Sequence, residues 1–151
     1  MKTQHSLDFV AVKRRFDGLR DGQKAEIRRA HWQDLDLVPA YYRLGIPPDK
    51  RWQRVVAMMP YVSLSHSEHP NRLGAALAKA DIHERRLFQM WRSESPTDFD
   101  YLRRIIEQAR QKNNLAIDWQ LFGNSLFYWG ENKKREIVQD FLAQYPQQKG
   151  N

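Results

Sequence analysis

The sequence predicts an all-α protein, a helical bundle made of two packed helical subdomains. Apolar residues recur with a helical period along almost the whole chain. No run alternates with a period of two for long enough to predict a strand. Only 7 glycines and 7 prolines occur in 151 residues, and most of them lie at the boundaries between helical segments. Apolar residues make up 41% of the chain, which is enough to form a packed core.

Four helical segments are predicted in the N-terminal part of the chain. Asp17-Gly18 should end the first segment, and Gly45 should end the third, which has Pro39 near its start. Asp49 is the expected N-cap of the fourth, and Pro60 should kink or end it. The segments span residues 7–16, 21–30, 35–44 and 49–59.

Five further segments follow a polar loop at residues 63–71. The clearest start signal is Ser95-Pro96, with an N-cap serine and a proline at the first helical position. Because polar residues end one helix just before this restart, we place the boundary between subdomains there, giving subdomains 1–94 and 95–151. The five segments lie at residues 73–80, 82–92, 95–109, 118–129 and 137–142.

The residues needed for a catalytic or metal centre are missing. There are 0 cysteines, which excludes disulfides, thiolate zinc sites and a cysteine nucleophile. His66 and His69 come closest to metal-ligand spacing, but they lie in the polar loop, which would not hold ligand geometry. No Gly-x-Ser-x-Gly, Gly-x-Gly-x-x-Gly or Gly-Lys-Ser/Thr motif is present. We therefore expect no enzyme activity, no metal and no cofactor.

No segment indicates a membrane. The longest apolar stretch, residues 55–62, is eight residues long and contains Pro60, whereas a bilayer-spanning helix needs about twenty. The N-terminus lacks the apolar segment of a signal peptide. We expect a cytoplasmic protein without a membrane partner.

The charge balance predicts a polyanionic partner. Lys and Arg number 25 against 18 Asp and Glu, for a formal net charge of +7. The cations fall in clusters on predicted helices or at their starts, where a guanidinium could bind phosphate oxygens. These clusters are Arg14-Arg15, Arg28-Arg29, Lys50-Arg51, Arg85-Arg86, Arg103-Arg104 and Lys133-Lys134-Arg135.

Each cluster taken alone is also typical of an ordinary solvated surface, paired with acids such as Glu107 and Glu136. Arg85 and Arg92 are seven residues apart and should share one helix face. Trp32 lies outside a clear apolar stripe and could stack on a base. The tryptophans at positions 52, 91, 119 and 129 lie on apolar stripes and are expected in the core.

Several motifs occur in one order and give a family resemblance. The most specific is the run LGAALAKADIHERRLFQ at residues 73–89. Before it come IRR at residues 27–29 and VPAYYRL at residues 38–44, and after it LRR at 102–104, DW at 118–119, WG at 129–130 and DF at 140–141. With these motifs, the chain resembles the CasB family, the small subunit of the type I-E CRISPR surveillance complex called Cascade, over about residues 10–143.

The resemblance implies a non-catalytic, all-helical subunit that sits as a pair along its complex and contacts the guide-holding backbone subunits. It implies binding of guide RNA and target DNA, with stabilisation of the R-loop and its displaced strand. A protein of this kind needs only to bind the nucleic-acid backbone, because the guide RNA recognises the target sequence by base pairing. A purely architectural subunit that docks onto proteins without contacting target DNA is the alternative. A helical enzyme acting on nucleic acid is a third possibility, which needs a carboxylate or histidine cluster.

Carried over by position, the resemblance implies that Arg29, Arg51, Arg92 and Arg104 bind nucleic acid. Their neighbours Arg28 and Arg103 belong to the same doublets, but adjacent helical residues point about 100° apart, so one of each doublet is expected to face the strand. In relatives, basic residues directly follow the Trp-Gly pair near the C-terminus. Here Glu131-Asn132 occupy those places, and the positive charge moves to Lys133, Lys134 and Arg135.

Overall fold

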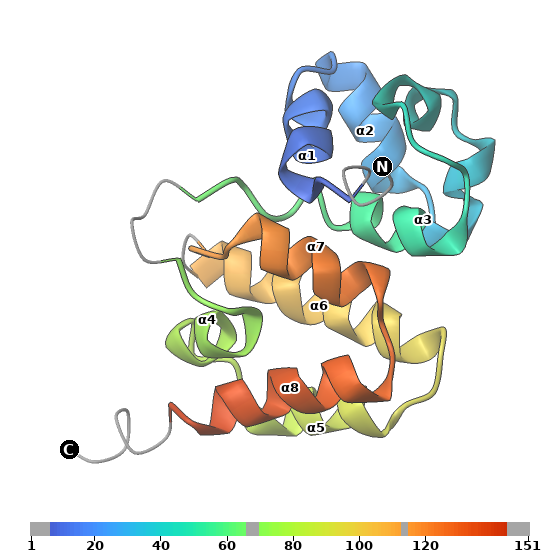
Figure 1. Ribbon diagram of the computed structural model, residues 1–151. Helices are drawn as coiled ribbons and strands as arrows, with labels where there is room; N and C mark the ends of the chain where they lie inside the picture. The colour runs from blue at the N-terminus through green and yellow to red at the C-terminus, as the bar shows by residue number, and fades with distance from the viewer. Residues whose placement is uncertain (1–6, 66–69, 113–114, 145–151) are drawn as a thin grey trace. The chain divides into compact units, whose positions relative to one another are not determined.

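The computed structural model describes residues 7–65, 70–112 and 115–144. Within these ranges the regular elements are eight α-helices and two 3₁₀ helices, with no strand (Figure 1). One isolated parallel bridge joins Asn71 to Ile117. The predicted all-α class is therefore confirmed. No helix among the described residues is long and apolar enough to cross a membrane.

The chain forms two compact units. The first contains the chain up to Pro60 together with Trp119–Tyr128, and the second contains Tyr61–Asp118 together with the chain from Trp129 onward. This division differs from the expected subdomains 1–94 and 95–151. The helices on either side of the expected boundary, α5 (Glu84–Arg92) and α6 (Thr97–Lys112), pack against each other within the second unit.

Two helices of the first unit begin at an aspartate side-chain cap, and the predicted cap at Asp49 is confirmed. Asp8 accepts a hydrogen bond from the Ala11 amide at the start of α1, and Asp49 accepts one from the Trp52 amide at the start of α3, both at 3.0 Å. The elements of this unit are α1 (Phe9–Asp17), α2 (Asp21–Arg29), η2 (Trp32–Leu37), η3 (Pro39–Leu44), α3 (Lys50–Ala57) and α7 (Trp119–Phe127).

The predicted helix over residues 35–44 is instead two 3₁₀ helices separated at Val38. Val38 has an extended backbone, because the proline that follows it disfavours the helical region and lacks a donor N–H. Gly45 ends η3 with a φ of 71°, in the left-handed region that glycine adopts readily. This end was predicted.

The core of the first unit centres on three aromatic rings. Phe9, Trp52 and Phe127 contact one another with ring centroids 5.2 to 5.8 Å apart. They come from α1, α3 and α7, so this cluster joins both segments of the unit. The buried face of α7 is formed by Trp119, Phe122, Leu126 and Phe127, whereas Leu121 is exposed.

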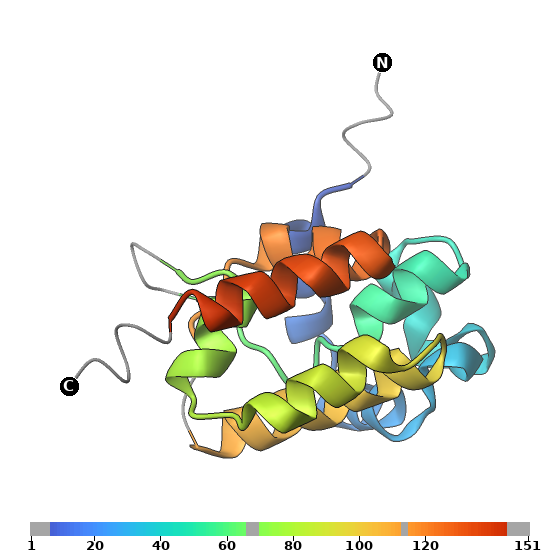
Figure 2. The ribbon, with the colours of Figure 1, turned by 90° about the horizontal axis from the view of Figure 1, so that it is seen from below.

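The second unit is built from α4 (Leu73–Lys79), α5, α6 and α8 (Glu131–Leu142). Helix α5 contacts both α6 and α8, and α4 packs against α8; Figure 2 shows α5 running alongside α6. The predicted helix over residues 95–109 is confirmed, and α6 buries an apolar face of Phe99, Leu102, Ile105, Ile106 and Ala109. Helix α6 begins at Thr97, two residues after the predicted cap Ser95.

Candidate nucleic-acid interface

The first unit presents three of the predicted arginines on its surface. Arg28 and Arg29 lie in the last turn of α2, and Arg51 lies in the first turn of α3; all three are exposed. Among the described residues, no ion pair engages Arg28 or Arg29. Their charges are therefore available to an outside partner.

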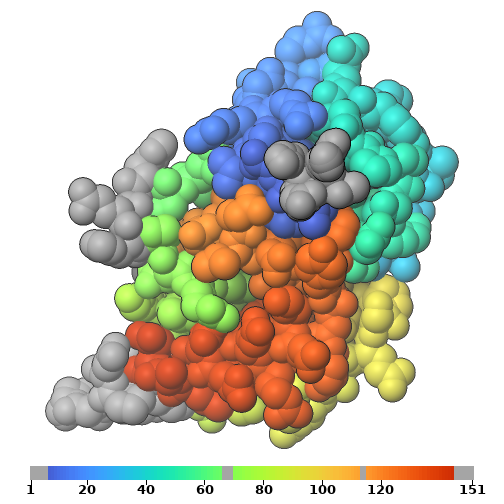
Figure 3. Space-filling view, in the orientation of Figure 1, coloured from blue at the N-terminus to red at the C-terminus, as the bar shows by residue number. Residues whose placement is uncertain are grey.

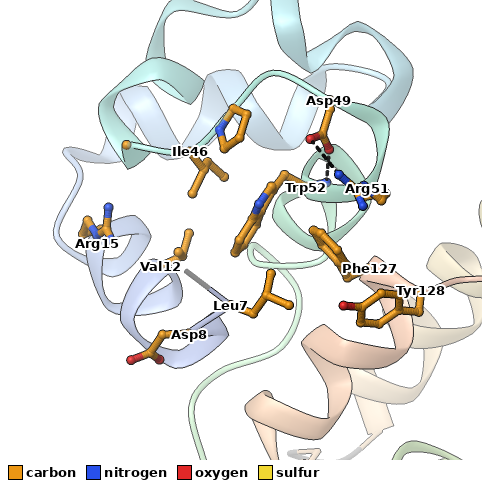
Figure 4. A pocket seen from close by; sticks show the side chains of 12 residues that line it. Leu7, Asp8, Val12, Arg15, Ile46, Asp49, Arg51, Trp52, Phe127 and Tyr128 are labelled. Carbon is orange, nitrogen blue, oxygen red and sulfur yellow. Dashed lines mark hydrogen bonds and ion pairs between the residues drawn. The ribbon is translucent and has the colours of Figure 1, made fainter. Parts of the chain in front are cut away.

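Arg51 borders a pocket of about 480 Å³ in the first unit. Its guanidinium lies 4.7 Å from the centre of the Phe127 ring and 3.7 Å from Asp49 Oδ2. Figure 4 shows Arg51 beside Phe127, with the buried Trp52 ring next to them. The Asp49 carboxylate also caps α3, so the cap and the aromatic ring together orient the Arg51 side chain.

The second unit places Arg92 and Arg104 over aromatic rings. The Arg92 guanidinium lies 5.7 Å from the centre of the Phe88 ring, and that of Arg104 lies 5.8 Å from the Tyr101 ring. Arg92 and Arg104 are both exposed, whereas Phe88 and Tyr101 are half-buried. Each arginine is therefore held near the surface by a ring on its own helix.

A groove of about 770 Å³ runs along this surface, where Phe88, Gln89 and Arg92 of α5 face Tyr101 of α6. The Gln89 side-chain amide donates to the Tyr101 hydroxyl at 3.2 Å and ties the two helices together. Arg85 lines the same groove, so the predicted shared face of Arg85 and Arg92 is confirmed.

The Arg103–Arg104 doublet is divided between two environments. Arg103 is half-buried and pairs with Glu107 Oε1 at 3.2 Å, one helical turn later. Arg104 is exposed over Tyr101. The two side chains of this doublet therefore differ in exposure, whereas Arg28 and Arg29 are both exposed.

The three consecutive cations of α8 differ more sharply in their exposure to solvent. Arg135 is exposed and lies 5.7 Å from the centre of the Trp91 ring, and Lys133 is half-buried near Glu136. Lys134 is 5% exposed; its ammonium lies 2.9 Å from Asp98 Oδ2 and 2.9 Å from the Ser93 carbonyl. The assignment of Lys134 to a nucleic-acid surface was therefore wrong, because its charge is used inside the second unit. Figure 3 shows the outer surface of α8 on the viewed face.

The base-stacking hypothesis for Trp32 is also wrong. Trp32 is 5% exposed, and the Arg54 guanidinium lies 5.9 Å from its ring. Its backbone carbonyl accepts a hydrogen bond from the buried Gln53. A ring enclosed in this way has no open face for a base.

Metal ligation finds no support in the part of the chain that the structure describes, which contains no group of three or more His, Asp or Glu suited to hold an ion. His66 and His69 lie outside the described residues.

The aromatic partners of the arginines were missed in the sequence. Phe88 is four residues before Arg92, and Tyr101 is three before Arg104, spacings that bring side chains together on a helix. That spacing was the available signal. No local pattern could have found the contact of Trp91 with Arg135, which are 44 positions apart.

This arrangement suits phosphate binding. A guanidinium held beside a ring still has N–H groups that can donate to phosphate oxygens. The ring restricts the conformations of the long side chain, and the cation–π contact contributes about 0.5–1 kcal/mol of attraction at an exposed site. Each unit therefore carries ordered and exposed positive charge.

Comparison with known proteins gives the family. A model of the family described as CRISPR-associated protein Cse2 matches residues 23–145. The Cascade subunit CasB of Escherichia coli K12 is 30% identical, over 90% of this chain and 93% of its own length. A chain in the crystal structure of E. coli Cascade bound to a PAM-containing double-stranded DNA target superposes with a TM-score of 0.74 at 29% identity, covering 90% of this chain and 97% of that one. The order of motifs, the all-helical fold and the family match agree, and the chain belongs to the CRISPR-associated protein Cse2 family.

Proposed function

We propose that this chain is a non-catalytic small subunit of a type I-E Cascade complex that binds nucleic-acid backbone without sequence preference. It would stabilise the R-loop between guide RNA and target DNA, including the displaced strand. The observation that carries the proposal is the similarity to a Cascade subunit over nine tenths of the chain. The formal net charge of +7 supports it.

The proposed contacts with phosphates come from both units. In the first unit they are Arg28, Arg29 and Arg51, and in the second Arg92, Arg103, Arg104, Lys133 and Arg135. Arg92, Arg104 and Arg135 are the strongest of the second set, because they are exposed and ordered by aromatic rings. Arg103 and Lys133 are weaker, since each has an acidic neighbour on its own helix.

The proposed partners are the guide RNA, the target DNA, the other Cascade subunits and a second copy of this chain. Binding by the isolated protein should be weak, because a few phosphate contacts are lost readily to salt. Within a complex, the high local concentration would make the same contacts effective.

A purely architectural role is the alternative, and one observation favours it. Leu37 and Tyr42, in η2 and η3, are 78% and 53% exposed. The Tyr42 hydroxyl donates to the Asp36 carbonyl at 2.7 Å, which orders the ring beside this exposed segment. Apolar side chains held at the surface are typical of protein contacts.

Reconstitution of the complex with two charge-matched variants tests the proposal. One variant replaces Arg29, Arg51, Arg92 and Arg104 by alanine, and the control replaces Arg14, Arg20, Arg43 and Arg110, which are also exposed. Each loses four positive charges. R-loop stability, measured by the protection of target DNA and of the displaced strand, should fall only in the first variant.

If both variants are incorporated normally and both complexes keep the R-loop stability of the wild type, the architectural role is favoured. Loss of incorporation on Leu37→Ser with Tyr42→Ser, with R-loop stability unaffected by the arginine changes, would point the same way. Hydrolysis of nucleic acid by the purified chain with Mg²⁺ would contradict the non-catalytic assignment.

A further inference from the structure

We propose that the second unit carries a base-stacking platform for single-stranded nucleic acid, formed by Tyr101, Phe88 and Trp91. We call these rings, with Arg104, Arg92 and Arg135, the arginine–aromatic row. The inference rests on the proposed function, and it adds that bases are contacted as well as phosphates.

The row runs across three packed helices. Tyr101 of α6 is joined to α5 through its 3.2 Å hydrogen bond with Gln89. Phe88 precedes Gln89 in α5, and its ring lies 6.2 Å from the Trp91 ring in an edge-on arrangement. Trp91 donates from Nε1 to Glu131 of α8 at 3.0 Å, and Arg135 of α8 lies over the same ring.

A cation accompanies each ring. The guanidinium-to-ring distances are 5.8 Å for Arg104–Tyr101 and 5.7 Å for both Arg92–Phe88 and Arg135–Trp91. All three arginines are exposed, and all three rings are half-buried. A half-buried ring is fixed by the core and still presents apolar surface to a ligand, and a guanidinium plane can itself stack on a base.

The groove along α5 and α6 provides the space. Its volume of about 770 Å³ is within the range of sites that take small organic groups. Phe88 and Tyr101 supply its aromatic surface, and Arg85 and Arg92 outweigh the one carboxylate in its lining, that of Glu84. The groove therefore complements a flat apolar group attached to an anion.

A single strand of nucleic acid has this chemistry. Its bases are unpaired and expose their faces, and each is joined to a phosphate. In a duplex the bases are stacked on one another, so a duplex would meet only the arginines. A protein partner could use the same rings, but the excess of arginine along the row favours a polyanion.

Binding of the full-length chain to two single strands tests the stacking directly. One is a mixed-sequence oligonucleotide, and the other has the same length and phosphate number but abasic sites throughout. We expect affinity for the normal strand to be higher by about fivefold or more, as stacking on even one ring would give. Fluorescence anisotropy at one salt concentration measures both.

Ring substitutions then locate the preference. Tyr101→Leu and Phe88→Leu should each reduce the difference between the two strands, and Tyr101→Phe, which keeps the ring, should preserve it. Tyr42→Leu removes an exposed ring of the first unit and should change nothing. Circular dichroism confirms that each variant is folded.

The outcomes separate this inference from the function on which it rests. Equal, salt-sensitive binding of both strands would overturn stacking and leave backbone binding intact. No binding of either strand by the chain alone, together with no loss of R-loop stability for the arginine variant in the reconstituted complex, would overturn both. A base preference that survives Tyr101→Leu with Phe88→Leu would overturn the location. If these two changes instead prevent the chain from being incorporated into the reconstituted complex, the arginine–aromatic row is a protein contact.

Discussion

Adjacent cations on α8 contribute differently to the free energy of unfolding, because a buried charge loses its hydration and an exposed one does not. Lys133 is partly exposed and lies 3.8 Å from Glu136. Lys134 has a side chain only 6% exposed, and its ion pair with Asp98 at 2.9 Å lies inside the second unit. The other Asp98 oxygen, Oδ1, has no hydrogen-bond partner among the described residues. Lys134 therefore stabilises the carboxylate that would otherwise be left alone in the core.

Lys134→Met should lower the free energy of unfolding by about 3–5 kcal/mol, because it leaves Asp98 buried and uncompensated. Urea denaturation measures the change. The control, Lys133→Met, should cost less than about 1 kcal/mol, as is usual for a surface pair. Adding Asp98→Asn to Lys134→Met should recover part of the loss. Equal effects of the two lysine changes would contradict the buried role of Lys134.

Tyr41 predicts a pH dependence of stability. It is fully buried, and its hydroxyl donates to the Pro47 carbonyl at 2.6 Å. Burial, together with the negative charge of Asp49, raises the pKa of Tyr41 above its ordinary value of 10.0. The folded protein thus holds this proton more tightly than the unfolded chain does. The stabilisation is complete below about pH 10 and declines as the pH rises above that value.

Tyr41→Phe should lower the free energy of unfolding by about 1 kcal/mol at neutral pH, through loss of the hydrogen bond. Above about pH 10 the difference from the wild type should shrink, since phenylalanine has no proton to lose. Denaturation at several pH values between neutrality and pH 11 measures it. A difference that stays constant over this range would contradict the raised pKa.

At the scale of elements, the close approach of α4 to α8 depends on one glycine. A Cβ at Gly74 would overlap the backbone carbonyl of Ile137 and lie 2.9 Å from the Phe141 amide nitrogen. Both neighbours are backbone atoms and cannot rotate away. Arg72, just before α4, pairs with Asp140 at 2.8 Å and holds the same two helices together at the surface. That pairing raises the pKa of Arg72.

Gly74→Ala should therefore lower the free energy of unfolding by about 1–3 kcal/mol, because the helices must separate. Gly22→Ala in α2 is the matched control, since nothing lies within 4 Å of a Cβ there. It should raise stability by about 0.5–1 kcal/mol, as alanine favours a helix over glycine. Thermal or urea unfolding compares them, and a harmless Gly74→Ala would show that α4 is not held this closely.

The helices were predictable where local signals determine them. The turn Asp17-Gly18, the Asp49 cap and the apolar stripe of α6 act within one or two helical turns, so a sequence pattern contains them. The split at Val38 was missed because apolar spacing outweighed the proline signal. The unit boundaries were not predictable either, because α7 joins the first unit through ring contacts with residues more than 60 positions away.

At the scale of the whole molecule, a formal charge of +7 makes any nucleic-acid binding sensitive to salt. If about six phosphates of a single strand are contacted, the slope of log affinity against log salt is about −4. Between about 50 and 200 mM salt this corresponds to a loss of a few hundredfold. The magnitude is a property of the combined surface and not of any one arginine.

The alanine variant at Arg29, Arg51, Arg92 and Arg104 should reduce that slope to about −1, because about two contacts remain. The charge-matched control at Arg14, Arg20, Arg43 and Arg110 should keep a slope near −4. Anisotropy titrations of single-stranded DNA across the salt range measure both. Slopes reduced equally in both variants would show that the binding reports net charge alone. Slopes near −4 in both would place the phosphate contacts elsewhere, first at Lys133 and Arg135.

The sequence by itself determined the helical class, the sign of the charge, the positions of most helix ends and the resemblance to the family. These depend on residue type and on spacings of a few positions, which a linear pattern records. Only the tertiary structure decided which cations reach the surface. Lys134 and Arg135 are neighbours of equal charge, but each helical step turns the side chain by about 100°. One therefore meets Asp98 and Ser93, more than 30 positions away, and the other lies exposed over Trp91.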